Sequence, residues 1–199
     1  MSGTLSIRNR QRAIPVDVRR LRRITLVLLR DLLAKETFEL GICLVRQPEM
    51  TRLNETFLGH NGPTDVITFD YSDAGYEELG RADLRAGLDA PQRVPAGFMA
   101  GELARKEPRG LHGEIVICVQ EAVSQARRFR TSWQRELARY VIHGLLHLEG
   151  YDDRRGADRR KMKREEGRLL RRLGRRCPIA PLARRLPSVR NSSIGNRGS

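Results

Sequence analysis

The sequence contains no long apolar run, and this absence argues against a membrane protein. About 18 consecutive apolar residues are needed to cross a bilayer as a helix, and no such stretch occurs in the 199 residues. The N-terminal residues carry scattered arginines but lack the apolar segment of a secretory signal. We therefore expect neither a membrane span nor a cleaved signal.

Cysteine and aromatic residues are also scarce. The three cysteines, Cys43, Cys118 and Cys177, lie far apart without a CxxC pair, and the first two fall in apolar runs. This arrangement favours buried free thiols over a disulfide framework, and we expect a reducing, cytoplasmic compartment. Aromatic residues make up 5% of the chain, so base stacking is not expected to dominate any nucleic-acid binding.

Charge is abundant but unevenly distributed. The net charge is +14. Residues 154–199 hold 16 Lys and Arg against 3 acidic residues, a net of +13, whereas residues 1–153 hold 22 against 21, a net of +1. The C-terminal block is typical of a segment that binds a polyanion such as nucleic acid. A solvated helix and a tail that only aids solubility account for the same charge.

Hydrophobic periodicity predicts four strands and about five helices. The strands are expected at residues 4–10, 40–45, 65–71 and 113–119, and the helices at 16–35, 48–58, 120–129, 132–148 and 154–173. The pattern TSWQ at 131–134 is a capping box, which predicts that Thr131 caps the following helix. Strands grouped around helices favour a single α+β domain.

Two segments do not fit this pattern. Residues 72–112 form a long connection without periodicity, which we interpret as an insertion. Residues 174–199 contain prolines and many arginines, and we expect a basic, disordered tail. The predicted division is therefore one domain over residues 1–173, including the insertion, and a tail over residues 174–199.

The stretch HGLLHLEGYDD, residues 143–153, holds the clearest chemical signal. His143 and His147 lie one helical turn apart, at the spacing with which two imidazoles bind one metal ion. Gly150 permits a sharp turn after the helix, and Asp153 follows closely enough to return as a third ligand. Three protein ligands leave a fourth position open, as in catalytic metal sites. Two hydrogen-bonded histidines without a metal are the alternative, although polar rings among apolar neighbours need partners.

The same stretch lacks the base of a common metalloprotease. In the helical motif HExxH the glutamate is the general base, and Gly144 occupies that position here. We expect this glycine to leave space beside the metal for a bulky substrate. The candidates for moving protons are Glu149, Asp152 and Asp65, each of which can equally cap a helix or orient an imidazole.

Three motifs in the order found here resemble those of the YbeY family of bacterial endoribonucleases. HGLLHLEGYDD is similar to the family hallmark H-G-x-L-H-L-x-G-Y-D-H. PTDVITF at 63–69 resembles the family's P-T-D-V-hydrophobic-S/T-F segment, and GEIVI at 113–117 resembles its G-D/E-I-V-I strand. The similarity covers residues 4–71 and continues from residue 113 to the vicinity of residue 170.

The resemblance implies a mixed four-stranded sheet and a zinc-dependent endoribonuclease. Such an enzyme cuts single-stranded RNA in ribosomal RNA maturation and ribosome quality control, and its partner is ribosomal RNA or the small ribosomal subunit. The implied zinc has three histidine ligands, but Asp153 stands in the third position here. A carboxylate is an accepted, harder ligand, which brings manganese, iron and nickel into consideration. The family's arginine after the LNxxY aromatic is replaced by Leu58, with His60 as a candidate substitute.

We therefore expect His143, His147 and Asp153 to bind one divalent ion, zinc, in each chain. The basic region 154–176 is expected to contact RNA phosphates with little sequence readout. The alternatives are a non-catalytic ribosome-assembly factor with a structural metal, a hydrolase with another substrate, and a DNA-binding protein. Gly144 argues against protease chemistry, and no recognition-helix signature supports DNA binding.

Overall fold

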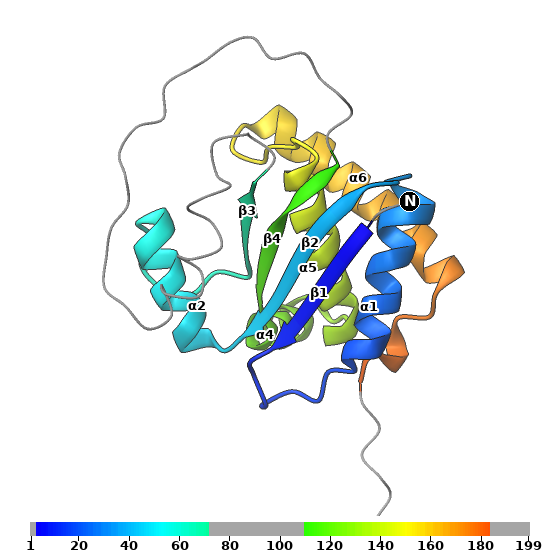
Figure 1. The fold of residues 1–199 in the computed structure, drawn as a ribbon. Helices are drawn as coiled ribbons and strands as arrows, with labels where there is room; N and C mark the ends of the chain where they lie inside the picture. Colours follow the sequence, from blue (N-terminus) through cyan, green and yellow to red (C-terminus); the bar gives the residue numbers. More distant parts are fainter. Residues whose placement is uncertain (1–2, 72–109, 184–199) are drawn as a thin grey trace, which may run out of the picture.

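A mixed sheet of four strands forms the centre of the molecule. The computed structural model describes residues 3–71 and 110–183 (Figure 1). Three strands are parallel neighbours, namely β1 (Gly3–Asn9), β2 (Phe38–Val45) and β4 (Leu111–Cys118). The edge strand β3 (Val66–Asp70) runs antiparallel to β4, so the order is β1-β2-β4-β3. The α+β class and the mixed four-stranded sheet are thereby confirmed.

Five α-helices occur among the described residues, as predicted. They are α1 (Val18–Leu26), α2 (Gln47–Leu53), α4 (Val119–Phe129), α5 (Trp133–Leu148) and α6 (Gly156–Arg176). Two helices continue as wider π-type turns, η1 (Val27–Leu32) after α1 and η2 (Asn54–Leu58) after α2, and η3 (Ala180–Leu182) is a short 3-10 turn. Solvent-facing polar residues alternate with buried ones along α1 and α6, which explains why their periodicity was readable.

The helices cover the two faces of the sheet unequally. In β2, Leu40, Ile42 and Leu44 belong to the main core cluster, to which α1, α5 and α6 also contribute. On the opposite face, Cys43 and Val45 belong to a smaller cluster with α2. Figure 1 shows α1, α5 and α6 on one side of the sheet and α2 beside the β3 edge. Alternation of side chains along a strand produces this division.

The chain after α5 is more extensively packed than predicted. The helix α6 runs to Arg176, and Cys177 and Leu182 beyond it are buried in the main core cluster. Ala183 forms a bridge with Val16. Residues 174–183, which the sequence assigned to the tail, thus pack against the domain, because two apolar side chains there fill the core. Residues 184–199, like most of the predicted insertion (72–109), lie outside the described residues.

The predicted cap of α5 is displaced by one residue. Ser132, not Thr131, is the N-cap, and its side chain accepts a hydrogen bond from the amide of Arg135 at 3.3 Å. The Thr131 hydroxyl instead donates to the carboxylate of Glu136, which is buried and requires a donor. Because Thr131 and Ser132 are adjacent and both can cap a helix, the sequence did not decide which of them is the N-cap.

The three cysteines are buried free thiols, as predicted. Burial raises the pKa of Cys43 to about 11, which keeps this thiol protonated and unreactive near neutral pH. Within the parts of the chain that the structure describes, no helix is long and apolar enough to cross a membrane.

Candidate metal centre

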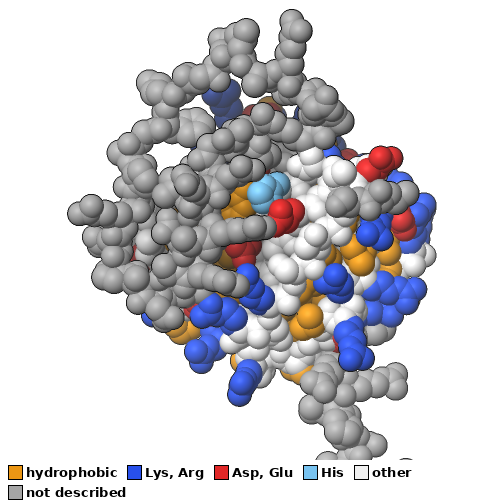
Figure 2. Space-filling view, in the orientation of Figure 1, with side chains coloured by type: hydrophobic (Ala, Val, Ile, Leu, Met, Phe, Trp, Pro, Cys, Tyr) orange, Lys and Arg blue, Asp and Glu red, His pale blue; other side chains and the backbone are white. Residues whose placement is uncertain are grey.

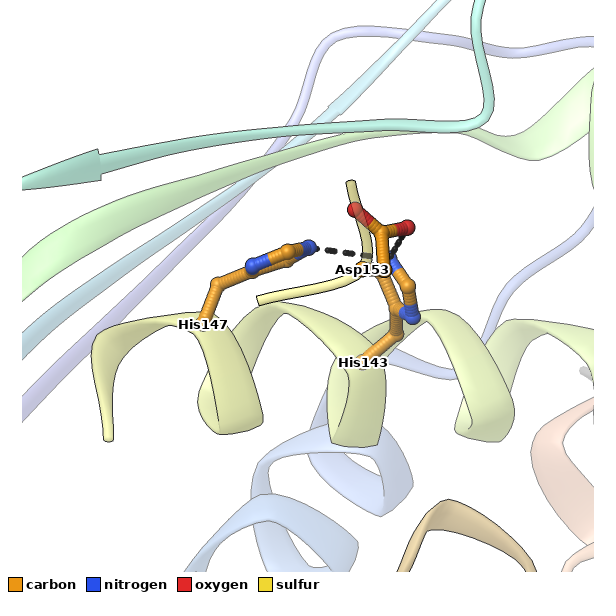
Figure 3. Close-up of side chains that lie close together, drawn as sticks. All are labelled: His143, His147 and Asp153. Atoms are coloured by element: carbon orange, nitrogen blue, oxygen red, sulfur yellow. Dashed lines mark hydrogen bonds and ion pairs between the residues drawn. The ribbon is translucent and has the colours of Figure 1, made fainter. Parts of the chain in front are cut away.

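The helix α5 and the turn after it bring the three predicted ligands together. His143 and His147 project from the same face of α5, and Gly150 adopts a left-handed backbone conformation with φ of 82°. The amides of Gly150 and Tyr151 donate to the last carbonyl groups of the helix, which closes the turn. Asp153 then returns toward the two rings (Figure 3).

The donor atoms of this group converge at short range. The Nε2 atoms of His143 and His147 lie 3.1 Å apart, and Asp153 Oδ2 lies 3.9 Å from Nε2 of His143. One donor atom from each residue lies within 4.8 Å of the others. The side chains of His143 and Asp153 are 25% and 43% exposed, so the group remains accessible from solvent.

Hydrogen bonds on the far side of each ring fix its orientation. Nδ1 of His147 lies 2.9 Å from the carbonyl oxygen of Tyr151, and Nδ1 of His143 lies 3.3 Å from the Glu166 carboxylate. Both partners only accept hydrogen bonds, so each Nδ1 carries the proton. Both Nε2 atoms are consequently left as lone-pair donors that face one another.

This donor set fits a divalent metal ion. Two imidazole nitrogens bound at about 2.0–2.1 Å to a tetrahedral zinc would lie about 3.3 Å apart, close to the 3.1 Å observed here. Two facing lone pairs repel unless a proton or a cation lies between them. Two imidazoles and one carboxylate form a known catalytic zinc set, and it leaves a position open.

The pKa values of the two histidines are shifted in opposite directions. Burial lowers the pKa of His143, but the hydrogen bond and the charge of Glu166 outweigh this effect, so the pKa lies above its ordinary value. Burial and the neighbouring His143 lower the pKa of His147. One imidazole is thus the preferred site for a proton, and a bound cation would take that proton's place.

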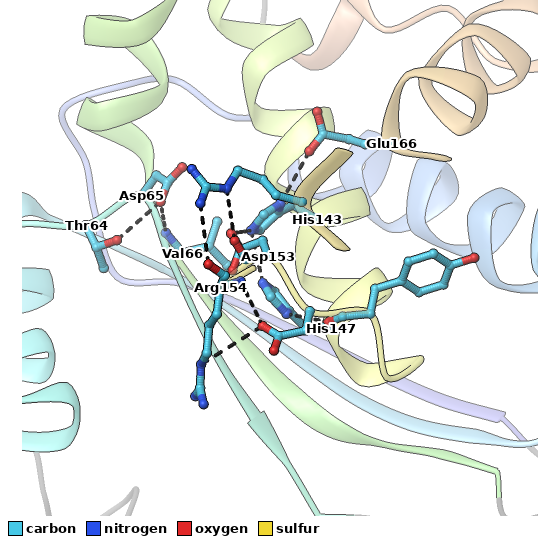
Figure 4. A network of polar contacts seen from close by, with 11 residues as sticks. Thr64, Asp65, Val66, His143, His147, Asp153, Arg154 and Glu166 are labelled. Atoms are coloured by element: carbon cyan, nitrogen blue, oxygen red, sulfur yellow. Dashed lines mark hydrogen bonds and ion pairs between the residues drawn. The ribbon is translucent and has the colours of Figure 1, made fainter. Parts of the chain in front are cut away.

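Glu166 on α6 is the anchor of His143. It is 8% exposed, and its second carboxylate oxygen lies 3.3 Å from the guanidinium of Arg139. Arg139 also contacts Glu136 at 3.2 Å, and Glu136 accepts the hydrogen bond from Thr131. A chain of paired groups therefore holds the Glu166 carboxylate against the ring of His143. Figure 4 shows Glu166 beside this ring. A carboxylate behind a ligating imidazole fixes the ring and raises its basicity.

A second contact holds the loop that carries Asp153. The guanidinium of Arg159, in the first turns of α6, donates to the carbonyl oxygens of Asp153 at 3.1 Å and of Arg154 at 3.4 Å. The amide of Arg154 donates to the carboxylate of Asp152 at 3.0 Å. These contacts bring the loop back over α5, so α6 supports two of the three ligands.

Gly144 does not serve the purpose expected of it. A Cβ atom on this residue would lie 2.7 Å from the side chain of Ile115 on β4. The glycine thus faces the sheet rather than the metal centre, and it permits close packing of α5 on β4. The expectation that it leaves space for a substrate is wrong, because it lies on a different side of the helix from the histidines.

The three candidates for proton transfer, Glu149, Asp152 and Asp65, each have partners other than the two histidine rings. Glu149 forms an ion pair with Lys35 at 2.8 Å, and Asp152 closes its own loop. Asp65 accepts hydrogen bonds from the hydroxyl of Thr64 and from the amide of Val66 (Figure 4). The charge of Asp65 also contributes to the raised pKa of His143. Leu58 is 48% exposed.

Sequence reasoning missed Glu166, Arg139 and Arg159. A signal for Glu166 was present, because it occupies the apolar face of α6 together with Met162 and Leu169. A charged residue at a buried position is uncommon and indicates a partner. The identity of that partner depends on how α6 crosses α5, which the sequence does not specify.

The chain is similar to proteins of one known family. Residues 6–174 match the family described as Endoribonuclease YbeY. A relative named Endoribonuclease YbeY from Salinibacter ruber is 34% identical over 131 residues, which cover 66% of this chain and 68% of the relative. Another of that name, from Thermobifida fusca, is 33% identical over 157 residues, with 79% and 86% covered.

A solved structure supports the fold. The solution structure of TM1509 from Thermotoga maritima matches with a TM-score of 0.52 and 21% identity, covering 94% of this chain and 100% of that one. At this identity the likeness concerns the fold alone. The family match spans most of the sheet, α5, the loop that carries Asp153 and most of α6. The chain therefore belongs to the YbeY endoribonuclease family.

Proposed function

We propose that the chain is a metal-dependent endoribonuclease that cuts single-stranded RNA in ribosomal RNA maturation and ribosome quality control. The observation that carries this proposal is the convergence of two Nε2 atoms, 3.1 Å apart, with the Asp153 carboxylate in a member of an endoribonuclease family. Ribosomal RNA, or the small ribosomal subunit, is the proposed partner.

Zinc is the proposed ion, with one bound per chain by His143, His147 and Asp153. Two imidazoles and a carboxylate suit zinc, while the harder oxygen donor makes manganese or iron the competing choices. A divalent ion held by these three residues would supply an activated water near neutral pH and polarisation of a phosphodiester. The metal content of the purified protein identifies the ion.

The chain's own residues orient and restrict this chemistry. Glu166 and the Tyr151 carbonyl hold the two rings so that both Nε2 atoms point to one position. Arg159 holds the backbone of the Asp153 loop. The partial exposure of His143 and Asp153 leaves an approach for a phosphodiester. Basic residues in the region 154–176 contribute attraction for the RNA backbone without sequence readout.

The endoribonuclease unit is proposed to include the packed residues up to Ala183. Its C-terminal helix supplies Glu166 and Arg159 to the metal centre, so a chain shortened before α6 would lose the orientation of two ligands. The division from a separate basic tail is then placed after residue 183 rather than after residue 173.

Substitution of His147 by alanine tests the metal centre. Removal of one imidazole should lower the metal content well below one per chain and reduce cleavage of a labelled single-stranded RNA by at least about a hundredfold. His112→Ala is the matched control, because this histidine pairs with Glu39 on the other face of the sheet. The control should retain its metal.

The outcomes separate the proposal from its alternative. Full metal occupancy in His147→Ala would remove the centre as described. A wild-type protein that binds metal but does not cut RNA, with or without chelator, would instead be a non-catalytic assembly factor. A preference for single strands is checked by comparing the cleavage of the same RNA before and after annealing to its complement.

A further inference from the structure

The outward face of α6 carries a straight line of arginines that the metal centre does not use. Arg160, Arg164, Arg168, Arg171 and Arg175 form this arginine row, and all five side chains are exposed. At about 100° per residue they fall within about 80° of arc, and at 1.5 Å per residue they span about 22 Å of the helix. Figure 2 shows basic side chains along the lower and right-hand parts of the visible face.

The row points away from the metal centre. Met162, Glu166 and Leu169 mark the buried face of α6, and the row lies about half a turn around the helix from them. Because Glu166 contacts His143, the buried face is the one directed to the metal ligands. A helix with its side chains is about 10–12 Å thick, so the row cannot contact the phosphate that is cut.

The charges of the row are largely uncompensated. Arg168 pairs with Glu165, whereas the other four arginines make no ion pair with any residue that the structure describes. Asp158 and Glu165 lie on the flanks of the helix rather than on the row. The helix as a whole has 10 basic and 3 acidic residues, a net charge of +7.

We infer that the arginine row is a docking surface for the phosphate backbone of double-helical RNA, separate from the cutting site. This inference rests on the proposed function in that RNA is the substrate. An RNA that docks on the row through a helical segment would present an adjoining single-stranded segment to the metal centre on the other side of α6. The preferred substrate is then a single strand beside a duplex.

The chemistry of the row favours a duplex backbone over other polyanions. All five residues are arginines, whose planar guanidinium groups bind phosphate oxygens through paired hydrogen bonds. The helix has no aromatic residue, so it offers no platform for the unstacked bases of a single strand. Double-helical RNA, in contrast, is recognised through its shape and its backbone. The apolar face of α6 is occupied by the core, which excludes insertion into a membrane surface.

Two variants with equal charge test the inference. The row variant carries Arg160→Gln, Arg164→Gln, Arg171→Gln and Arg175→Gln. The control variant carries Arg12→Gln, Arg19→Gln, Arg52→Gln and Arg127→Gln, which are exposed and lie on other parts of the chain. Each variant lowers the net charge from +14 by 4, to +10. Glutamine is a good helix former, and circular dichroism checks that both variants fold.

Binding is measured in chelator, without cleavage, to an RNA duplex of about 16 base pairs and to an unstructured strand of equal length. The row variant should bind the duplex at least about tenfold more weakly at physiological salt, with the slope of log K against log salt reduced by about 3–4. The control variant should differ less than about twofold from wild type. Cleavage of a short single-stranded RNA at saturating concentration, measured without chelator, should keep its rate in both variants, because the arginines add attraction for RNA and do not contact the phosphate that is cut.

Each contrary result has a distinct meaning. Equal weakening by the control variant would show that general charge, not the row, attracts RNA. Equal weakening of duplex and single strand would overturn the choice of duplex, and loss of short-RNA cleavage in the row variant would place the row in the cutting site. Row-dependent binding of polyglutamate in place of duplex would identify an acidic protein as partner. Failure of wild type to cut any RNA overturns the proposed function but leaves the duplex-binding test intact.

Discussion

The two imidazoles of the metal centre depend on different kinds of partner. His147 is held by the backbone carbonyl of Tyr151, which remains whichever residue stands at that position. His143 is held by the Glu166 side chain, which one substitution can remove. The orientation of His143 is therefore the more vulnerable of the two, although Glu166 belongs to no recognisable motif.

Glu166→Gln should weaken metal binding while the three ligands remain in place. A neutral amide lowers the basicity of His143 and cannot balance Arg139, so we expect a loss of about 10–100-fold in metal affinity. Competition with a chromophoric chelator measures this change. Glu165→Gln is the control, because the neighbouring carboxylate pairs with Arg168 at the surface. Equal affinities of the two variants would contradict the assigned role of Glu166.

Glu114 provides a pH-dependent prediction elsewhere in the molecule. Burial raises the pKa of this carboxyl group on β4, while Arg8 offsets part of the effect. A carboxyl group with a raised pKa in the folded state favours the fold when protonated and opposes it when charged, so its cost appears as the pH rises above its unfolded pKa. Glu114→Gln should therefore raise the melting temperature by about 2–4 °C at pH 7.

The difference between Glu114→Gln and wild type should shrink as the pH falls, and it should disappear below the unfolded pKa of a glutamate, about 4.3. Thermal melts across this range measure it. A variant that melts below wild type at neutral pH would show that the charged form makes a stabilising contact, and the burial effect would then be the smaller of the two.

At the scale of the element, α5 depends on a glycine for its approach to β4. Ala at position 144 would bring its Cβ to 2.7 Å from Ile115, closer than such atoms pack. Gly144→Ala should therefore destabilise the fold by about 1–3 kcal/mol through overpacking, despite the better helix propensity of alanine.

The matched control for Gly144→Ala is Gly174→Ala in α6. A Cβ at position 174 would meet no atom within 4 Å among the described residues, so the variant should gain up to about 1 kcal/mol from helix propensity. Urea denaturation of both variants measures the difference. The packing explanation fails if the two substitutions shift the midpoint in the same direction.

The predictions from sequence succeeded and failed at this scale for definable reasons. Strand and helix positions followed from local periodicity, and the turn at Gly150 followed from the need for a left-handed residue. The cap at Ser132 was missed because Thr131 is nearly as suitable. The packing of Leu182 was missed because the apolar residues of this short segment, interrupted by two prolines, show no periodic pattern.

At the scale of the whole molecule, the metal centre joins segments that are otherwise separate. Its proposed ligands come from α5 and the following loop, and α6 supplies contacts that support two of them. An ion that binds only the folded chain stabilises it by about 2.7 kcal/mol at a hundredfold excess over Kd. We expect zinc to raise the melting temperature of the metal-free protein by about 5–10 °C.

This gain should shrink as the pH falls. Protons compete with the ion for the Nε2 atoms, and the raised pKa of His143 means that competition begins at a higher pH than for an ordinary histidine. Melting curves with zinc or with chelator at several pH values measure the effect. His147→Ala should show no gain at any pH, and a gain that persists in this variant would place the ion elsewhere.

The sequence by itself determined the periodic elements, the family and the three proposed ligands, because each depends on the spacing of residues within short segments. His143 and His147 share a helix, and Asp153 lies in the loop that directly follows this helix. Only the tertiary structure decided which face of α5 meets the sheet, that Glu166 and Arg159 support the ligands, and that the arginine row points away from them. These relations depend on how α6 packs against α5, and helix packing is set by side chains far apart in the sequence.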